Sequence, residues 1–326
     1  MRFALAIGLA LALVTGPLCA HAQDDPTPDT QAALDTVRAA LDDFAQAETY
    51  SGQITQTIEQ VVTITYLGET VALTQHMKLE GTAIVQQGPG QSAANRQIDF
   101  VQSIAQTMEG GGLDEATEIG PVAFHVRVVD NRYYLHVEAD DPAVAAQFPA
   151  GWRDVTDGAG AFPGMNLFDI EGVLAIDSNA AAGLAGGLLD AVIDISQDPG
   201  ADPAGEAPDR YRLELDAART LDLIGLPAMS GVFEEGRVPF DVPALIERLF
   251  YDDATRYTVH VAIDPRTNAL VEYVDEWQMD VAITPDLMTD PALEGATMTI
   301  EQHSVQAFRP AALNEAVTIT APEIAE

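Results

Sequence analysis

The chain has 326 residues, of which 47% are hydrophobic, so it has enough apolar side chains to build a folded core. Its 15 lysines and arginines against 51 aspartates and glutamates give a formal net charge of −36, which makes nucleic acid a poor partner. The single cysteine, Cys19, excludes a disulfide within the chain and argues against a cysteine-based zinc site or a cysteine nucleophile.

The first residues have the organisation of a secretory signal peptide. Arg2 precedes an apolar stretch over residues 3–14, and Ala20-His21-Ala22 supplies the small residues that a signal peptidase requires. We therefore expect residues 1–22 to be removed after Ala22, and the product to be exported to the periplasm or the extracellular space. We expect no lipid anchor at Cys19, because the bulky Leu18 before it fits a lipobox badly.

One amphipathic helix opens the remaining chain, and long hairpins follow. Apolar residues at spacings of three and four predict a helix from about Thr30 to Ala47. Period-two alternation predicts a long strand with one wet face from Tyr50 to Tyr66, and a second strand returns after the turn Leu67-Gly68-Glu69. Further segments follow in chain order: strands at 70–87, 96–108, 122–129 and 132–138, a short turn or helix at 142–148, and residues 151–155.

The middle of the chain has a different composition. Residues 179–195 are rich in Ala, Gly and Leu and predict a helix, whereas the prolines within 196–209 predict a flexible loop. A short strand at 211–215 and helices at 218–224 and 242–250 complete a helical insertion around residues 178–250. Strands resume in the last third: 257–263, a five-residue turn at 264–268, 271–283, 296–308, and a candidate edge strand at 317–322.

Strands never alternate regularly with crossover helices in this order, which argues against a doubly wound parallel sheet. The sequence predicts an α+β fold in one domain over residues 23–326. In this fold a large curved antiparallel sheet, an open half-barrel, has helices covering its concave face.

Three segments resemble the LolA-like and LppX/LprG-like exported proteins. They are NRYYLHVEADDPAVAAQFPAGWRDV (131–155), YTVHVAIDPRTNALVEYVDEWQMDV (257–281) and VTITAPEIA (317–325). Asn268 stands where the hairpin of that family usually has Gly, and Asn also tolerates positive φ. The resemblance implies an open half-barrel that holds a lipid or an acyl-bearing protein between sheet and helices. The lipobox of some members is missing, so membrane anchoring does not carry over.

Motifs of catalysis and metal binding are missing from the sequence. It contains no G-x-S-x-G, P-loop, Rossmann or H-E-x-x-H pattern. His125, His136 and His260 fall on the polar register of strands, which is typical of solvated histidines. We therefore expect no enzyme activity, cofactor, catalytic residue or metal site. Weak calcium binding by the acid-rich residues 194–209 stays open, although they lack the spacing of a calcium loop.

The leading hypothesis is a monomeric, non-enzymatic carrier or binding protein for a lipid, a lipoprotein or another hydrophobic ligand. An acyl chain needs only shape and apolar area, at ~0.8 kcal/mol per buried CH₂, and a membrane or envelope partner would exchange it transiently. The expected cavity walls are Ile54, Ile58, Val62, Phe124, Val126, Tyr257, Val259, Val261 and Trp277, with Leu184, Leu188 and Leu189 on a lid. Two alternatives are a cell-envelope or surface interaction module with a filled core and no ligand, and a hydrolase with an unfamiliar site.

Overall fold

The structure of the chain is a computed structural model. The structure describes residues 28–87, 96–112, 116–146, 148, 150–156, 188–198, 207–224, 241, 244, 245, 248, 254–289 and 295–324. The predicted signal peptide, Cys19 and Leu184 lie outside these residues, as does most of the predicted helical insertion.

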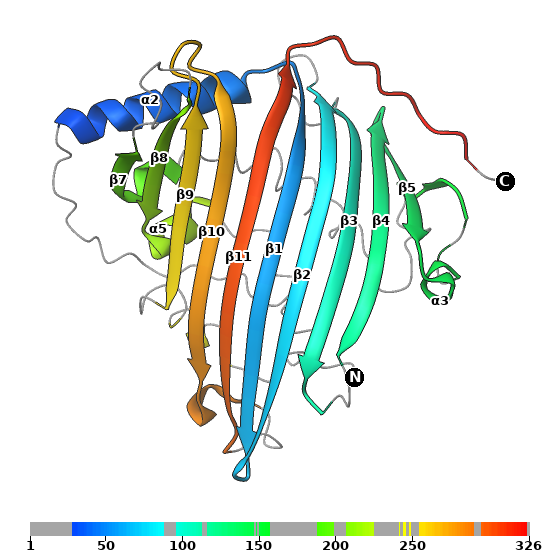
Figure 1. The fold of residues 1–326 in the computed structure, drawn as a ribbon, viewed down its shortest axis with the longest axis vertical. Helices are drawn as coiled ribbons and strands as arrows, with labels where there is room; N and C mark the ends of the chain where they lie inside the picture. Colours follow the sequence, from blue (N-terminus) through cyan, green and yellow to red (C-terminus); the bar gives the residue numbers. More distant parts are fainter. Residues whose placement is uncertain are drawn as a thin grey trace.

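Eleven strands of the described residues form one antiparallel sheet, which is not closed (Figure 1). The strands of the first part are β1 (Thr49–Tyr66), β2 (Glu69–Gln86), β3 (Gln97–Gly110), β4 (Thr117–Val129), β5 (Arg132–Ala139) and β6 (Arg153–Asp154). The strands of the second part are β7 (Val192–Asp198), β8 (Asp209–Leu215), β9 (Thr255–Ile263), β10 (Leu270–Ile283) and β11 (Thr297–Leu313). The helical elements are α2 (Pro28–Ala45), α3 (Pro142–Ala145), η3 (Leu188–Ala191), α5 (Ala217–Ile224) and η5 (Pro285–Leu287).

The sheet consists of two meanders that meet at its centre. Its spatial order is β6-β5-β4-β3-β2-β1-β11-β10-β9-β8-β7, so each strand lies beside its sequence neighbour except where β1 pairs with β11. That pairing runs from Tyr50 opposite Leu313 to Thr65 opposite Thr297. The long alternating segments of the sequence thus become the long central strands, as predicted.

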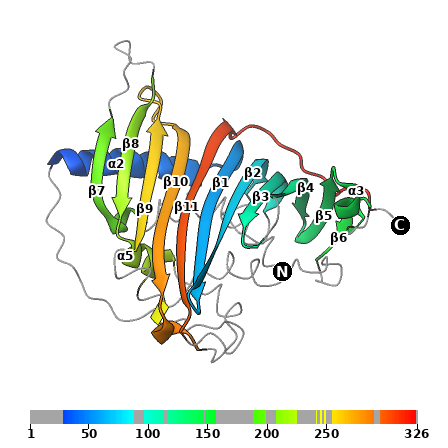
Figure 2. The ribbon, with the colours of Figure 1, turned by 60° about the horizontal axis from the view of Figure 1, so that its bottom comes forward.

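The two faces of the sheet differ because helix α2 covers one of them. It crosses behind β8, β9 and β10 in Figure 1, and Figure 2 shows the row of strands bending from β7 towards β6. Val37, Leu41 and Phe44 of α2 are buried in one cluster with Tyr211 and Phe308 of the sheet. We call the face that α2 covers the inner face and the opposite one the outer face. The described part of the chain contains no helix that is long and apolar enough to span a membrane.

The tight turns have the backbone that their residues favour. Asp130 and Asn131 both have positive φ, 51° and 60°, as the two-residue hairpin between β4 and β5 requires. Asn268, in the turn between β9 and β10, has φ of 57°. The prediction that Asn replaces Gly there at little cost is consistent with this conformation.

Two local predictions were wrong. Residues 192–195, predicted as the end of a helix, belong to strand β7, which runs on through 196–198 where a loop was expected. The β-branched Val192, Ile193 and Ile195 favour this strand, whereas the small residues before them suggested a helix. Residues 317–322 form no strand. They belong to a C-terminal tail that passes the upper ends of the strands towards β5 (Figure 1) and pairs once, through Ile324, with Trp152.

The tail adds a small hydrophobic cluster on the outer face. Ile319 is buried against Val129 of β4 and Tyr134 of β5, with Trp152 and Val317 beside them. Val317 and Ile319 of the tail therefore stabilise the part of the sheet that β4 and β5 form. The sequence also predicts helices that cover the rest of the inner face. The residues expected to form them lie largely outside those that the structure describes.

Candidate functional site

All nine strand residues predicted to line a cavity lie on the inner face. Directly opposite residues of paired strands share a face, and a row of such pairs links Phe124 through Gln102 and Gly81 to Ile54. A second row links Ile58 through Ser304 and Trp277 to Tyr257. The nine residues that period-two alternation assigned to the apolar side of their strands therefore share one face of the sheet.

Most of these residues are packed in a core. Ile54, Val126, Tyr257, Val259 and Val261 are buried in the cluster that includes α2. Leu188 and Leu189, predicted on a lid helix, lie in the short helix η3 and are buried in the same cluster. Val62 belongs to a second cluster lower on the sheet. Phe124 and Trp277 pack against the first cluster but keep partial exposure.

Part of the inner face is apolar and still accessible to solvent. It lies on the lower halves of β1, β2 and β3 in Figure 1. Ile64 is 37% exposed and Val71, directly opposite it, is 47% exposed. Four neighbours, Ile58, Leu73, Met77 and Ile104, keep intermediate exposure. We call these six residues the uncovered apolar surface.

Polar side chains separate the two hydrophobic clusters on the inner face. Along β11, Phe308 belongs to the first cluster and Ile300 to the second, with Gln306, Ser304 and Gln302 between them. The neighbouring strands continue the pattern, and we call the set the glutamine band: Gln56, Gln60, Gln75, Gln102, Gln106, Gln302 and Gln306. The Gln60 amide donates a hydrogen bond of 2.9 Å to the Gln302 amide oxygen.

The carboxylate of Asp275 lies on β10, beside the glutamine band. Asp275 lies directly opposite Gln306 on one side and Val259 on the other. The Trp277 indole N–H donates to the carboxylate, while burial raises the pKa of Asp275 to about 7. The other oxygen, Oδ1, is inaccessible and has no hydrogen-bond partner among the described residues. Such an orphaned acceptor is uncommon in a folded protein, and it costs free energy unless something donates to it.

Two tyrosines complete the surroundings of Asp275. The Tyr257 ring stacks on the Trp277 ring. Tyr273 lies on the same face of β10, two residues before Asp275. Burial raises the pKa of both tyrosine hydroxyls, and the nearby Asp275 charge raises it further. Both tyrosines are therefore neutral at ordinary pH, so Asp275 carries the titratable charge of this cluster.

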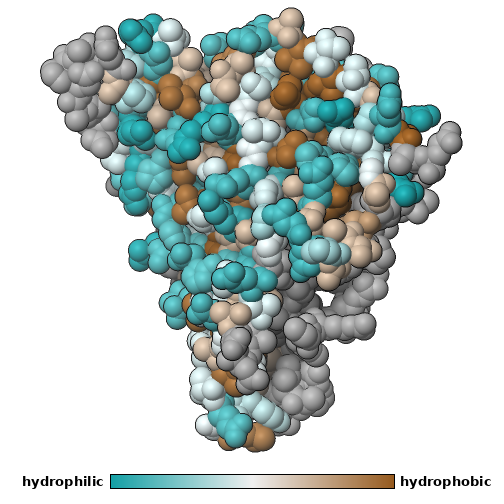
Figure 3. Space-filling view, turned by 45° about the vertical axis from the view of Figure 1, so that its right-hand side comes forward, coloured by the Kyte–Doolittle hydropathy of each residue, from teal (hydrophilic) through white to brown (hydrophobic). Residues whose placement is uncertain are grey.

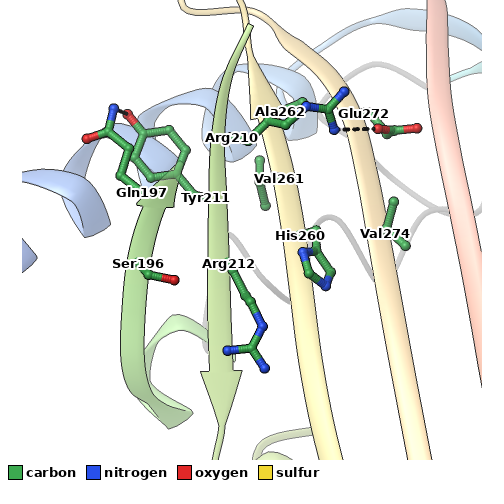
Figure 4. Close-up of a pocket in the computed structure, with 10 residues that line it drawn as sticks. All are labelled: Ser196, Gln197, Arg210, Tyr211, Arg212, His260, Val261, Ala262, Glu272 and Val274. Atoms are coloured by element: carbon green, nitrogen blue, oxygen red, sulfur yellow. Dashed lines mark hydrogen bonds and ion pairs between the residues drawn. The ribbon is translucent and has the colours of Figure 1, made fainter. Parts of the chain in front are cut away.

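The outer face carries paired charges. A groove of about 450 Å³ is lined there by residues of β7 to β10, among them Arg210, Arg212 and His260 (Figure 4). Glu272 accepts from both Arg210, at 3.2 Å, and Arg309, at 2.6 Å. Because these cations already have carboxylate partners, the groove offers little charge to a ligand.

The histidines follow the outer face as well. His303 lies 2.8 Å from Glu276, and His260, which was predicted to be a surface histidine, lies 3.6 Å from the same carboxylate. His125 and His136 are different, since both are partly buried and their rings lie near each other and near Trp152. Within the described ranges no three His, Cys, Asp or Glu side chains come together in a way that could hold a metal ion.

Hydrophobic residues on the visible side of the molecule are scattered. Figure 3, turned to bring the β4–β5 side forward, shows hydrophobic and hydrophilic side chains interspersed there. On the inner face, by contrast, the exposed hydrophobic residues Ile64 and Val71 lie directly opposite each other.

Comparisons with known proteins give distant structural likenesses. No family model matches the chain, and neither does any curated protein sequence. A structure titled for lipid–protein interactions in lipovitellin matches at 8% identity and a TM-score of 0.35, covering 86% of this chain and 27% of that one. A DUF1329 family protein from Desulfovibrio piger matches at 10% identity and a TM-score of 0.20, covering 85% and 92% of the two chains. A putative outer membrane lipoprotein-sorting domain from Vibrio parahaemolyticus matches at 7% identity and a TM-score of 0.14, covering 88% and 93%.

The polar part of the site was missed in the sequence. The even-numbered positions of β1 are mostly apolar, which predicts an apolar face, but Gln56 and Gln60 occupy two of them. Asp275 was likewise overlooked, although the apolar register of β10 that carries Tyr273 and Trp277 also carries Asp275. A polar residue on the apolar register of a strand was the signal that could have identified this site.

Proposed function

We propose that the chain is a non-enzymatic, exported carrier that binds a hydrophobic ligand, a lipid or an acyl chain, on the inner face of its sheet. The observation that carries the proposal is the uncovered apolar surface, which continues directly from the buried core. Exposed apolar side chains gathered on one face of a sheet favour an apolar partner.

The size of the sheet suits a chain-like ligand. The uncovered apolar surface extends along β1 from Ile58 to Ile64, six residues apart, which is roughly 20 Å of strand, and Gln60 of the glutamine band lies between these two residues. An acyl chain lying along it gains ~0.8 kcal/mol for each CH₂ removed from water. Binding of this kind requires no catalytic group.

An interaction module with a filled core is the second candidate. It is favoured by the burial of most predicted wall residues, since Val259 and Val261 are inaccessible in the main cluster. In that case the uncovered apolar surface would meet another protein instead of a lipid. Both candidates depend on export, which the signal-peptide pattern of residues 1–22 predicts.

Native mass spectrometry of the purified chain, together with titration of a fluorescent acyl probe, tests the proposal. We expect co-purifying lipid or saturable probe uptake, and at least fivefold weaker uptake in the double variant Ile64→Gln, Val71→Gln. Ile193, which is 59% exposed on the edge strand β7, gives the matched control Ile193→Gln, which should bind as the original chain does. A folded chain that holds no lipid and takes up no probe would favour the interaction module.

A further inference from the structure

The polar residues of the inner face point to the kind of head group that the ligand carries. This inference rests on the proposed function, because it assumes that an amphipathic molecule occupies the inner face. We propose that Asp275, Trp277 and the glutamine band bind the head of this ligand, and that the head is an ammonium group.

The first argument is the unsatisfied acceptor. Asp275 Oδ1 is inaccessible and unpartnered in the described structure, although Trp277 donates to the same carboxylate. Asp275 as a whole is partly exposed, so a hydrogen-bond donor bound at its carboxylate would offset the cost of the orphaned oxygen, and an ionised donor would form the stronger interaction. Gln306, directly opposite on β11, offers an amide oxygen as a second acceptor at the same level of the sheet.

The second argument is the distribution of charge between the faces. On strands β1–β5 and β7–β11, register places every basic side chain on the outer face: His76, Lys78, His125, Arg127, Arg132, His136, Arg210, Arg212, Arg256, His260, His303 and Arg309. None of these cations lies on the inner face to neutralise Asp275. An anionic head group, such as a fatty acid carboxylate, would therefore meet a like charge there, whereas an ammonium group would meet its counter-ion.

The third argument is the aromatic pair beside the carboxylate. Tyr257 and Trp277 stack with ring centroids 4.2 Å apart, and Trp277 keeps partial exposure on the inner face. An aromatic ring next to a carboxylate favours a cation over a neutral hydroxyl, because the ring face carries a partial negative charge. This distinguishes an ammonium head from an uncharged polar head, which the amides of the glutamine band would accept equally well.

The position of the site suits a ligand that has both a hydrocarbon chain and an ammonium head. Ile58 of the uncovered apolar surface lies opposite Ser304, which in turn lies opposite Trp277. The distance from Ile58 to Trp277 thus covers two strand spacings, roughly 10 Å. A molecule whose chain lies along β1 and β2 can therefore place its head beside Asp275.

The dependence on pH follows from the groups that face Asp275. From β9 and β10 these are Tyr257 and Tyr273, whose raised pKa values keep them neutral, and from β11 the uncharged Gln306. Glu276 and His260 lie on the outer face, where they pair with each other. Since the pKa of Asp275 is about 7, its charge is mostly present at pH 8 and mostly absent at pH 5.5.

Three probes with one alkyl chain test the inference: dodecylamine, dodecanol and dodecanoate, titrated into the full chain at pH 8 and moderate salt. We expect dodecylamine to bind at least tenfold more tightly than dodecanol, and dodecanoate to bind most weakly. Asp275→Asn should abolish the preference for the amine and keep dodecanol binding. Asp280→Asn removes the same charge from an exposed position of the same strand, and it should keep the preference.

The outcomes separate the two proposals. If dodecanol binds but the amine has no advantage, or if Asp275→Asn keeps the advantage, the ammonium site is wrong and the carrier function stands. If none of the probes binds, the carrier function and the ammonium site both fail. Loss of the amine preference in the original chain at pH 5.5 gives a second measurement that does not depend on how well the variant folds.

Discussion

Tyr257 and Trp277 stack across strands β9 and β10, with ring centroids 4.2 Å apart and ring planes inclined by 22°. Both were predicted from the sequence to line a cavity. The stack is the point where the buried core of the inner face meets its accessible part, since Tyr257 is buried and Trp277 is only partly so.

Trp277 should therefore report ligand binding. The chain has two tryptophans, and the other, Trp152, lies on the outer face beneath Arg127, whose guanidinium is 5.0 Å from the ring. We expect an acyl probe to change the intrinsic fluorescence of the chain and of Trp152→Phe, but not that of Trp277→Phe. A response that persists in Trp277→Phe would place the bound probe elsewhere.

Truncating the core of the sheet should lower the free energy of unfolding strongly. Leu213 on β8 is fully buried in the main cluster, so Leu213→Ala leaves a cavity and should cost about 3 kcal/mol. Leu67, in the β1–β2 turn, is 85% exposed, and Leu67→Ala should change stability by less than about 0.5 kcal/mol. Urea denaturation of the two variants measures the difference, and similar losses would contradict the assigned core.

Two glycines offer a matched test of the strand register. A Cβ added at Gly81 of β2 would collide with the backbone oxygen of Val101 on β3, whereas one added at Gly120 of β4 would meet nothing within 4 Å. Gly81→Ala should therefore destabilise the sheet by about 2 kcal/mol or more, because the neighbouring backbone has to move.

Gly120→Ala should be close to neutral. Thermal unfolding of both variants provides the measurement. Equal effects at the two positions would mean that β2 and β3 are paired differently from the register described above.

Asp275 should make the stability of the chain depend on pH in an unusual direction. Its pKa is about 7 when folded and about 3.9 in an unfolded chain, so the folded state binds the extra proton between these values. The contribution of Asp275 to stability is therefore fully present below about pH 4 and is lost as pH rises towards 7.

Asp275→Asn removes this dependence, and it should raise the free energy of unfolding at pH 8 by up to about 4 kcal/mol while changing little at pH 4. The comparison of variant with original chain is needed because Asp154, Asp264 and Asp286, whose pKa values are lowered, act in the opposite direction. A stability difference that is constant between pH 4 and pH 8 would show that Asp275 does not titrate as described.

Much of the fold could be predicted from the sequence because most strands alternate clearly. β1, for example, was predicted from Tyr50 to Tyr66 and runs from Thr49 to Tyr66. Alternation fails where a segment is short or rich in small residues, as at 192–198, where the pairing with β8 decides the conformation. It also overpredicts strands at 317–322, since the alternating apolar residues there pack against the outer face without joining the sheet.

The candidate site could be predicted only in its apolar half. Alternation locates a face, and it placed Ile58 and Trp277 on the same face although they are 219 residues apart in the sequence. It gives no information on which strands are neighbours across the sheet. The meeting of Asp275 with Gln306 depends on the pairing of β10 with β11, and the glutamine band further depends on β11 lying beside β1.

The pairing of β1 with β11 also governs how the molecule can be assembled. A nascent chain that lacks its last thirty residues has two meanders, each ending in a long strand whose amides and carbonyls have no partner. Pairing β1 with β11 brings together residues that are more than 230 positions apart in the sequence, and contacts between such distant residues form slowly during folding. C-terminal truncation is therefore expected to leave two half-sheets whose unpaired edge strands are prone to association. Separately expressed halves should associate through the pairing of β1 with β11.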